Sequence, residues 1–120
     1  TKNVIQISAE DLHDMLLGGT EFVLVDVRSP SEFANSHIKG AVNIPAPDLR
    51  TRHTELSPEK PTACICSTGH RSSLAASILK EHGFSEVLNA AGGMTGYSAA
   101  GYTQKCRVCV TPHGSRYADE

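Results

Sequence analysis

The chain has 120 residues, the size of one compact domain, and its 39% hydrophobic and 20% charged residues are typical of a globular protein rather than a disordered one. Eleven Lys and Arg against thirteen Asp and Glu give a formal net charge of -2, so there is no basic excess to hold a nucleic acid backbone. No apolar stretch approaches the roughly 20 residues of a membrane-spanning helix, and we expect neither nucleic acid nor a membrane as a partner.

Strand and helix signals alternate along the chain. Ser8 stands three residues before Asp11, the spacing of a capping box that starts a helix. Residues 22–27 form a β-branched apolar run, which is typical of a strand buried on both faces. A later helix has an apolar face made of Leu74, Ala75, Ile78 and Leu79. In the first half of the chain, the predicted elements are a strand at 4–7, a helix ended by Gly18-Gly19, a strand at 22–27, one or two helical turns at 31–36 and a strand at 41–44. A loop with at most a short helix follows at 45–61. The second half is predicted to contain a strand at 62–66, a helix ended by Gly83, a strand at 86–88 and a tight turn at 91–94.

This alternation predicts an α/β domain with a mostly parallel central sheet flanked by helices. We expect the domain to cover residues 1–103 and a polar tail to follow at 104–120. Ligands of such sheets bind beyond the carboxyl ends of the strands. The loop that follows Cys66 is therefore the first candidate for a functional site.

The residues around Cys66 favour a reactive thiol. Cys66 ends a predicted strand, Gly69 relieves the backbone of the loop, and Arg71 opens a helix. Backbone amides of such a loop can form a nest for an anion, and the helix N-terminus and Arg71 add positive charge. A thiol placed there has a lowered pKa and reacts as the thiolate, and His70 strengthens this effect when protonated. The alternative is a buried, inert cysteine, with Arg71 paired to a surface carboxylate.

Four separated segments resemble the rhodanese-like domain family, from about Ile5 to Tyr102. They are Val25-Asp26-Val27-Arg28 with Glu32-Phe33, the stretch from His37 to Pro45, the loop from Cys66 to Ser72, and Gly83-Phe84 leading to Gly92-Gly93-Met94. The resemblance implies a three-layer rhodanese-like fold, with Cys66 as the nucleophile that carries a sulfane sulfur as a persulfide. It also implies a substrate-binding loop formed by Ser67, Thr68, Gly69, His70 and Arg71.

The implied activity is that of a single-domain sulfurtransferase. A small donor such as thiosulfate would supply the sulfur, and cyanide, a small thiol or a protein thiol would accept it. Each half-reaction is an exchange between sulfur atoms, so no metal or organic cofactor is expected. We expect a cytoplasmic protein, with a removed leader as the open alternative because the chain begins with Thr1.

Two other functions stay open on the sequence. Domains of this family also serve as non-enzymatic interaction or sulfur-relay modules of larger proteins, often without the loop cysteine, which this chain keeps at Cys66. Phosphatase or arsenate reductase activity is the third alternative. Four residues separate Cys66 from Arg71, whereas the related dual-specificity phosphatases have five, and the shorter loop suits a sulfur atom better than a phosphate.

Other polar residues of the resembling segments are interpreted as architectural. Asp26 ends a buried strand, where a carboxylate normally bonds to a neighbouring loop, and Arg28, Glu32 and His37 are given the same interpretation. Cys64 lies two positions before Cys66 and so points to the same side of the strand. It is interpreted as a core residue, with an exchange between Cys64 and Cys66 left open.

The tail contains a second pair of cysteines. Cys106 and Cys109 are separated by two residues, with His113 nearby, which is a spacing found in metal sites and dithiols. A structural zinc site needs four ligands and only three candidates are present. We therefore expect unpaired thiols first, a disulfide or an acceptor of sulfur from Cys66 second, and zinc last, and we assign no metal.

Overall fold

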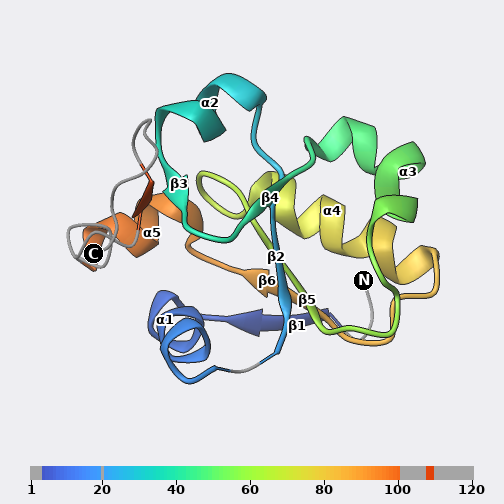
Figure 1. Ribbon diagram of the computed structural model, residues 1–120, viewed down its shortest axis with the longest axis horizontal. Coiled ribbons are helices and arrows are strands. Elements are labelled where there is room, and N and C mark those ends of the chain that lie inside the picture. Colours follow the sequence, from blue (N-terminus) through green and yellow to red (C-terminus); the bar gives the residue numbers. More distant parts are fainter. Residues whose placement is uncertain (1–3, 20, 101–107, 110–120) are drawn as a thin grey trace.

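The computed structural model describes residues 4–19 and 21–100, together with the backbone of 108–109 (Figure 1). The strands are β1 Val4–Ile7, β2 Val23–Asp26, β3 His37–Ile38, β4 Val42–Asn43, β5 Thr62–Ile65, β6 Val87–Ala90 and β7 Val108–Cys109. The helices are α1 Ala9–Leu17, α2 Pro30–Asn35, α3 Leu49–Arg52, α4 His70–Glu81 and α5 Gly93–Ala99, with 3-10 turns η1 Ala46–Asp48 and η2 His53–Glu55.

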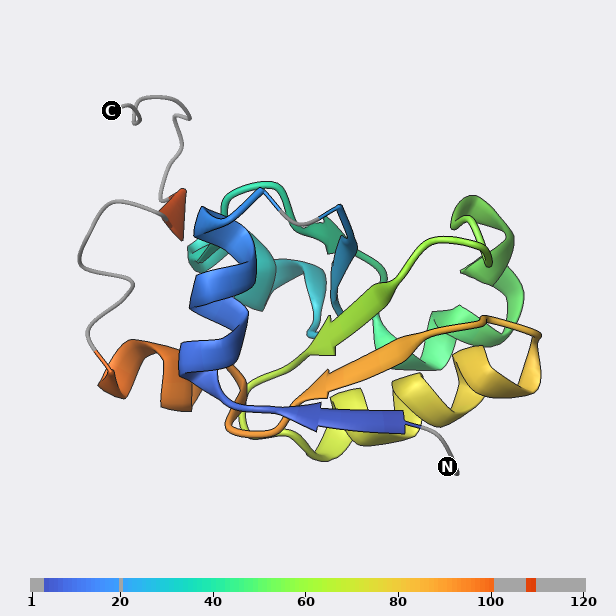
Figure 2. The same ribbon diagram turned by 90° about the horizontal axis from the view of Figure 1, so that it is seen from below.

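Five strands form one parallel sheet in the order β1-β6-β5-β2-β4. The arrows of β1, β5 and β6 run in the same direction in Figure 2, so their carboxyl ends meet at one edge of the sheet. Helices cover both faces, which gives three layers (Figures 1 and 2). The predicted α/β fold is confirmed.

Each face of the sheet has its own apolar core. One core joins the sheet to α3 and α4 and contains Cys64, Cys66, Leu49 and Leu79 among its buried residues. The other joins the sheet to α1 and α5 and contains Leu12 and Tyr97. Consecutive residues of β5 alternate between the two cores, as the pleat of a strand requires. Cys64 and Cys66 therefore share one core, as predicted.

Local signals account for most helix ends. Ser8 caps α1 through a capping box with Asp11, as predicted, and Ser29 caps α2 in the same way with Glu32. Gly83, with φ of 89°, follows the end of α4. This left-handed conformation favours glycine and ends the helix at the predicted place.

Four details of the predicted elements differ from the structure. The segment 45–61, predicted to hold at most a short helix, contains η1, α3 and η2. The predicted turn at 91–94 contains the start of α5, and two residues missed by the prediction form β3. Leu74 is 55% exposed, so it does not belong to the buried face of α4. Its place is the rim of a cavity beside that helix.

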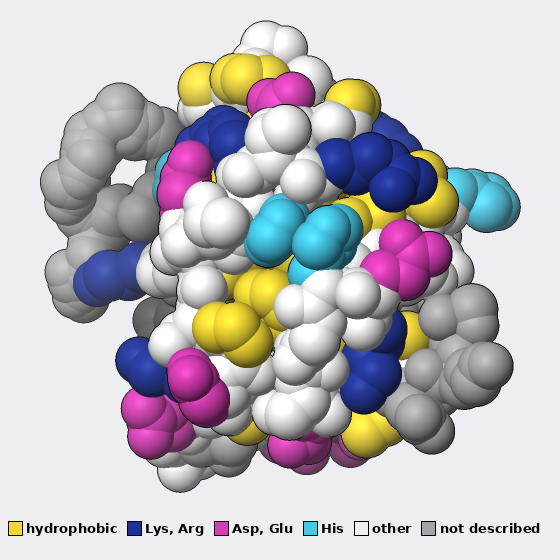
Figure 3. Space-filling model, turned by 90° about the vertical axis from the view of Figure 1, so that its right-hand side faces the viewer, with side chains coloured by type: hydrophobic (Ala, Val, Ile, Leu, Met, Phe, Trp, Pro, Cys, Tyr) yellow, Lys and Arg dark blue, Asp and Glu magenta, His cyan; other side chains and the backbone are white. Residues whose placement is uncertain are grey.

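A pair of stacked histidines connects η2 to the end of α4. Two histidine side chains lie together on the face shown in Figure 3. The rings of His53 and His82 have centroids 3.9 Å apart, and Nδ1 of His82 lies 2.9 Å from the carbonyl oxygen of Ile78. This contact holds η2 against the end of α4 that lies farther from the Cys66 loop.

One described segment of the tail, β7, lies against the domain. β7 pairs antiparallel with β3, with His37 opposite Cys109 and Ile38 opposite Val108. Cys106 and His113 lie outside the described residues, and for Cys109 the description covers the backbone alone. Among the described residues, no helix is both long and apolar enough to cross a bilayer.

Candidate active site

The loop after β5 is held against α5 by backbone hydrogen bonds. The N–H of Met94 donates to the carbonyl of Cys66 at 2.6 Å, and the N–H of Thr95 donates to the carbonyl of Ser67 at 2.9 Å. Both donors belong to the first turn of α5, where N–H groups have no partner within the helix. The start of α5 therefore fixes the first two peptides of the Cys66 loop.

Two glycines allow this close approach. Gly69 has φ of 103°, and a Cβ at this position would collide with the carbonyl oxygen of Ala91. Gly93 has φ of 61°, and its Cβ would lie 2.5 Å from the carbonyl oxygens of both Cys66 and Ser67. Other residues would meet both a strained backbone and a steric clash here. Gly69 was predicted as part of the site, whereas the contact made by Gly93 was not.

The sulfur of Cys66 is surrounded by hydrogen-bond donors. The N–H of Gly69 donates to Sγ at 3.0 Å and the N–H of Ser72 at 3.3 Å, and Oγ of Ser72 lies 3.4 Å from Sγ. The side chain of Cys66 is 1% exposed, and that of Ser72 is fully buried. The sulfur also lies near the N-terminus of the 12-residue helix α4, whose dipole favours negative charge.

This environment favours the thiolate of Cys66. Burial raises the pKa of the thiol, but hydrogen bonds from the side chain and backbone of Ser72 and from the backbone of Gly69 and Thr68 outweigh it. The net result is a pKa below the ordinary value of a cysteine. For Cys64, burial and the neighbouring Cys66 raise the pKa to about 12. The two cysteines share a core, yet their surroundings shift the thiol pKa in opposite directions, downward for Cys66 and upward for Cys64.

Ser72 was missing from the predicted site residues. The predicted substrate-binding loop ends at Arg71, but the N–H of Ser72 also donates to the sulfur, and its hydroxyl oxygen lies within hydrogen-bond distance of Sγ. The available signal was its position in the first turn of the helix that follows the loop. Side chains and N–H groups of a first turn face the preceding loop.

Arg71 is paired with a carboxylate from α2. Nη1 of Arg71 donates to Oε1 of Glu32 at 2.9 Å, and Nη2 donates to Oγ of Ser67 at 3.0 Å. The hydrogen bond from Arg71, followed by that from the backbone of Ser29, lowers the pKa of Glu32 to about 2. Arg71 is thus paired with a carboxylate, and Glu32 contacts the loop as well as capping its own helix.

Asp26 and Arg28 form a buried pair beside the loop. Two nitrogens of Arg28 donate to the carboxylate of Asp26, the shorter contact being 2.7 Å. Arg28 also donates to the carbonyl of Ser36, and Nδ2 of Asn43 donates to the carbonyls of Asp26 and Arg28. These contacts tie β2, β4 and α2 together. They agree with the architectural interpretation of Asp26 and Arg28.

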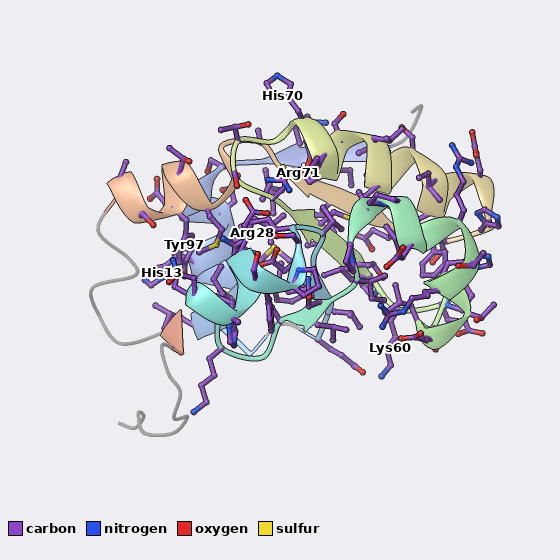
Figure 4. All side chains as sticks on the ribbon, turned by 90° about the horizontal axis from the view of Figure 1, so that it is seen from above. His13, Arg28, Lys60, His70, Arg71 and Tyr97 are labelled. Carbon is purple, nitrogen blue, oxygen red and sulfur yellow. The ribbon has the colours of Figure 1, made fainter. Side chains whose placement is uncertain are left out.

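His70 and Arg71 point in different directions at the start of α4. Figure 4 shows His70 projecting outward, whereas Arg71 turns in toward the region of Arg28. His70 is exposed, and its Nδ1 lies 3.2 Å from Oγ1 of Thr68. The structure thus brings Ser67 and Arg71 together on one side of the loop and Thr68 and His70 on the other.

A cavity lies on each side of the loop. The cavity of about 530 Å³ touches Thr68, Gly69 and His70, and the cavity of about 540 Å³ touches Ser67 and Arg28. Both volumes fall within the roughly 300–1,000 Å³ of small-molecule sites. Within the described ranges, no three His, Cys, Asp or Glu side chains cluster in a way that could hold a metal ion.

Comparisons with known proteins identify the family of this domain. The sequence profile of the rhodanese-like domain family matches residues 8–100. A rhodanese-related protein from Thermoplasma volcanium has a similar crystal structure, with a TM-score of 0.74 and 31% identity, over 82% of this chain and 94% of that one.

Three curated relatives show the range of proteins that contain this domain. The chain is 31% identical to the sulfurtransferase of Allochromatium vinosum, covering 82% of this chain and 92% of that protein. It is 33% identical to the putative sulfur carrier protein YrkF of Bacillus subtilis, with coverages of 77% and 50%. It is 43% identical to the uncharacterized protein YqhL of the same organism, with coverages of 58% and 56%. The chain thus spans about half the length of the two Bacillus relatives.

Proposed function

The chain belongs to the rhodanese-like domain family, and on that basis we propose that it is a sulfurtransferase in which Cys66 carries the transferred sulfur as a persulfide. One observation carries the proposal. Two backbone N–H groups and the hydroxyl of Ser72 converge on a single buried sulfur at the carboxyl edge of a parallel sheet. A relative that the chain covers over most of its length is named a sulfurtransferase.

In the first half-reaction, the Cys66 thiolate attacks the outer sulfur of a donor such as thiosulfate. A new S–S bond forms to Sγ, the S–S bond of the donor breaks, and sulfite leaves with the bonding electron pair. The lowered pKa of Cys66 supports this step because it keeps the thiol in its nucleophilic form. No proton has to be transferred when the thiolate is already present.

In the second half-reaction, an acceptor removes the outer sulfur. Cyanide, a small thiol or a protein thiol attacks the persulfide, and Sγ of Cys66 leaves as the thiolate. The donors of Gly69 and Ser72 stabilise the negative charge that returns to Sγ. These donors are held in place by the backbone before the reaction, so they need no rearrangement.

We assign the rest of the loop to substrate binding. Ser67 and Arg71 form one wall beside the sulfur, and Thr68 and His70 form the other, with Gly69 between them. Arg71 lies where a donor's anionic group can contact it, although Glu32 already neutralises part of its charge. The chemistry of both steps needs no metal or organic cofactor. We further propose that residues 1–103 are the functional domain and that the protein acts in the cytoplasm.

A sulfur-relay or interaction module is the second candidate function. It is favoured by the lengths of the relatives, because the chain covers 50% of a protein named a putative sulfur carrier. In that case Cys66 would still accept sulfur, but the acceptor would be a thiol of a partner domain. The persulfide step is common to the enzyme and the relay, so that step is tested first.

Intact-mass analysis after incubation with thiosulfate tests the proposal. We expect a gain of one sulfur atom that cyanide removes and that Cys66→Ser abolishes. Cys64→Ser is the matched control, because Cys64 lies two residues before Cys66 and in the same core yet has a raised pKa. No gain with thiosulfate or with other sulfane donors would overturn the persulfide proposal and favour interaction or phosphatase-like chemistry.

A further inference from the structure

The cavity on the Thr68 side of the loop is lined by a buried asparagine, Asn89. Asn89 on β6 is 3% exposed, and its Nδ2 donates to Oε1 of Gln6 on β1 at 2.9 Å. Its Oδ1 is buried and has no hydrogen-bond partner among the described residues. Both side chains line the cavity of about 530 Å³. Since a buried polar atom without a partner is rare and destabilising, this oxygen points to a ligand that donates a hydrogen bond.

The other walls are polar but almost free of charge. Ser73 and Ser77 of α4 provide hydroxyl groups, and the amide of Gln6 adds a further donor and acceptor. Leu74, which is 55% exposed, adds an apolar contact at the rim. His70 is the one ionisable side chain among the described residues that line it. Such a surface matches amide groups and short apolar side chains better than it matches an anion.

The cavity is separated from the sulfur by a single peptide. Gly69 lines the cavity, and its N–H donates to Sγ of Cys66 at 3.0 Å. A ligand seated between α4 and β6 can therefore place a reactive group at the loop while its remaining atoms fill the cavity. The cavity therefore lies beside the candidate active site and not on a distant surface of the domain.

We propose that this cavity binds the acceptor of the sulfur, and that the acceptor is a cysteine within a peptide. Backbone amides on either side of that cysteine donate to Oδ1 of Asn89 and exchange hydrogen bonds with Gln6, Ser73 and Ser77. The inference rests on the proposed sulfur transfer for its chemistry, but the binding of a peptide does not depend on it. A free short peptide and a segment of a larger protein share this chemistry.

The transfer step balances without a further reagent. The Cys66 persulfide first takes up one proton from solvent. The thiolate of the peptide then attacks its outer sulfur, and a new S–S bond forms between the two sulfur atoms. The S–S bond to Sγ breaks, its electron pair returns to Cys66 as the thiolate, and the persulfide proton stays with the sulfur that leaves. The peptide departs as a persulfide, and no electron is gained or lost overall.

Binding is tested first, with a peptide that cannot react. Acetyl-Gly-Ser-Gly-amide is titrated into Cys66→Ser protein while the amide signals are followed by NMR. We expect the signals of Ser73, Ser77 and the side-chain amide of Asn89 to shift with increasing peptide. Peptides extended at either end distinguish a free tripeptide from a protein segment as the natural source. Unchanged signals at these three residues with every peptide would overturn the inference.

Transfer kinetics provide the second test. Acetyl-Gly-Cys-Gly-amide is compared with cyanide, which is too small to fill the cavity. Ser73→Phe removes a hydroxyl and places a bulky ring in the cavity from an exposed helical position. It should lower the ratio of peptide to cyanide kcat/KM by at least about fivefold, the effect of losing one neutral hydrogen bond. Asn89→Leu should lower the ratio to a similar extent by removing the oxygen acceptor. Ala34→Phe, at an exposed position of α2, is the matched control and should leave the ratio unchanged.

The outcomes separate this inference from the proposed function. Absence of a Cys66 persulfide would contradict sulfur transfer, while NMR shifts with the serine peptide would still support the cavity as a peptide site. A persulfide that forms normally, with ratios unaffected by both Ser73→Phe and Asn89→Leu, would overturn the acceptor role. Thermal unfolding of each variant shows whether it is folded, and Ser73→Phe covers the case in which Asn89→Leu does not fold.

Discussion

Arg71 and Glu32 are joined by two hydrogen bonds, of 2.9 and 3.3 Å, although they lie 39 residues apart in the chain. The arginine that follows the Cys66 loop is thus paired with a carboxylate before any substrate arrives. On the proposed function, a dianionic donor such as thiosulfate would meet a site whose positive potential comes mainly from backbone N–H groups and the start of α4. We therefore expect Glu32 to influence which sulfur donors the loop accepts.

Removing this carboxylate should improve the use of thiosulfate. Glu32→Gln frees Arg71 from its ion pair, and we expect KM for thiosulfate to fall about two- to fivefold, the range of a partly exposed ion pair. The effect should shrink at high salt, because salt screens exposed charges. Steady-state kinetics at low and high ionic strength measure it.

Glu55→Gln is the matched control for the change of charge. Glu55 pairs with Arg52 at 2.8 Å in an exposed position on another part of the surface. The same change there should leave KM for thiosulfate unaltered. An equal fall in both variants would show that overall charge, rather than the pairing of Arg71, sets the affinity for the donor.

Ser72→Ala should raise the pKa of Cys66. The hydroxyl of Ser72 is the largest of the hydrogen-bond contributions that lower this pKa against the effect of burial. Without it, the rate of alkylation by iodoacetamide should rise with pH through a higher midpoint than in the wild-type protein. Ser57→Ala removes an exposed hydroxyl and should keep the wild-type midpoint. Identical midpoints in all three proteins would argue against a role of Ser72 in activating the thiol.

The parts of the site that could be predicted from sequence are those encoded locally. The run from Cys66 to Arg71 combines a strand end, a glycine and a helix start within six positions, so propensity alone places the loop. The pairing of Glu32 with Arg71 could not be found in this way, because it depends on how α2 packs against the loop. Helix α5 was missed for a related reason. Two glycines in the stretch 93–99 weaken its intrinsic helix propensity, and contacts with the Cys66 loop help to fix its first turn.

Cys64 should resist alkylation in the folded protein. Its pKa is raised to about 12, mainly by burial, so almost no thiolate exists near neutral pH. After treatment with iodoacetamide at pH 7.5, peptide mapping by mass spectrometry should find Cys66 modified and Cys64 intact. When the protein is denatured before treatment, both cysteines should be modified. Rapid labelling of Cys64 in the native protein would contradict its core assignment and reopen an exchange between Cys64 and Cys66.

The ion pair of Glu32 and Arg71, which joins α2 to the loop, should survive mild acid. Arg71, followed by the backbone of Ser29, lowers the pKa of Glu32 from an ordinary 4.5 to about 2. Because the folded-state pKa is the lower one, the pair contributes stability fully above about pH 4.5 and loses it as the pH falls toward 2. The side chain of Glu32 is 38% exposed, so solvent screening keeps this contribution small.

An NMR titration of the Glu32 carboxyl group measures this directly. We expect its midpoint to lie well below those of exposed glutamates in the same protein, and to move up toward them in Arg71→Lys, since lysine cannot form the two parallel hydrogen bonds. A midpoint near 4.5 in the wild-type protein would show that the pair is open in solution. Glu32 would then have no influence on the loop.

Gly93→Ala should damage the loop more than it damages the rest of the domain. The added Cβ would lie 2.5 Å from the carbonyl oxygens of Cys66 and Ser67, and φ of 61° is strained for alanine. We expect the free energy of unfolding to fall by about 1–3 kcal/mol from the backbone strain alone. The collision must also displace the two loop carbonyls, which accept hydrogen bonds from Met94 and Thr95. Since those peptides position the sulfur, formation of the persulfide should slow as well.

Gly96→Ala tests whether the effect of Gly93→Ala depends on that position or follows from the loss of any glycine in α5. Gly96 lies in the same helix, and a Cβ there would meet nothing within 4 Å. Alanine should therefore keep or increase stability, by up to about 1 kcal/mol, because it restricts the unfolded chain and favours helix. Thermal unfolding and the rate of sulfur gain from thiosulfate are measured for both variants. If Gly93→Ala matched Gly96→Ala in both, the start of α5 would not be what holds the Cys66 loop in place.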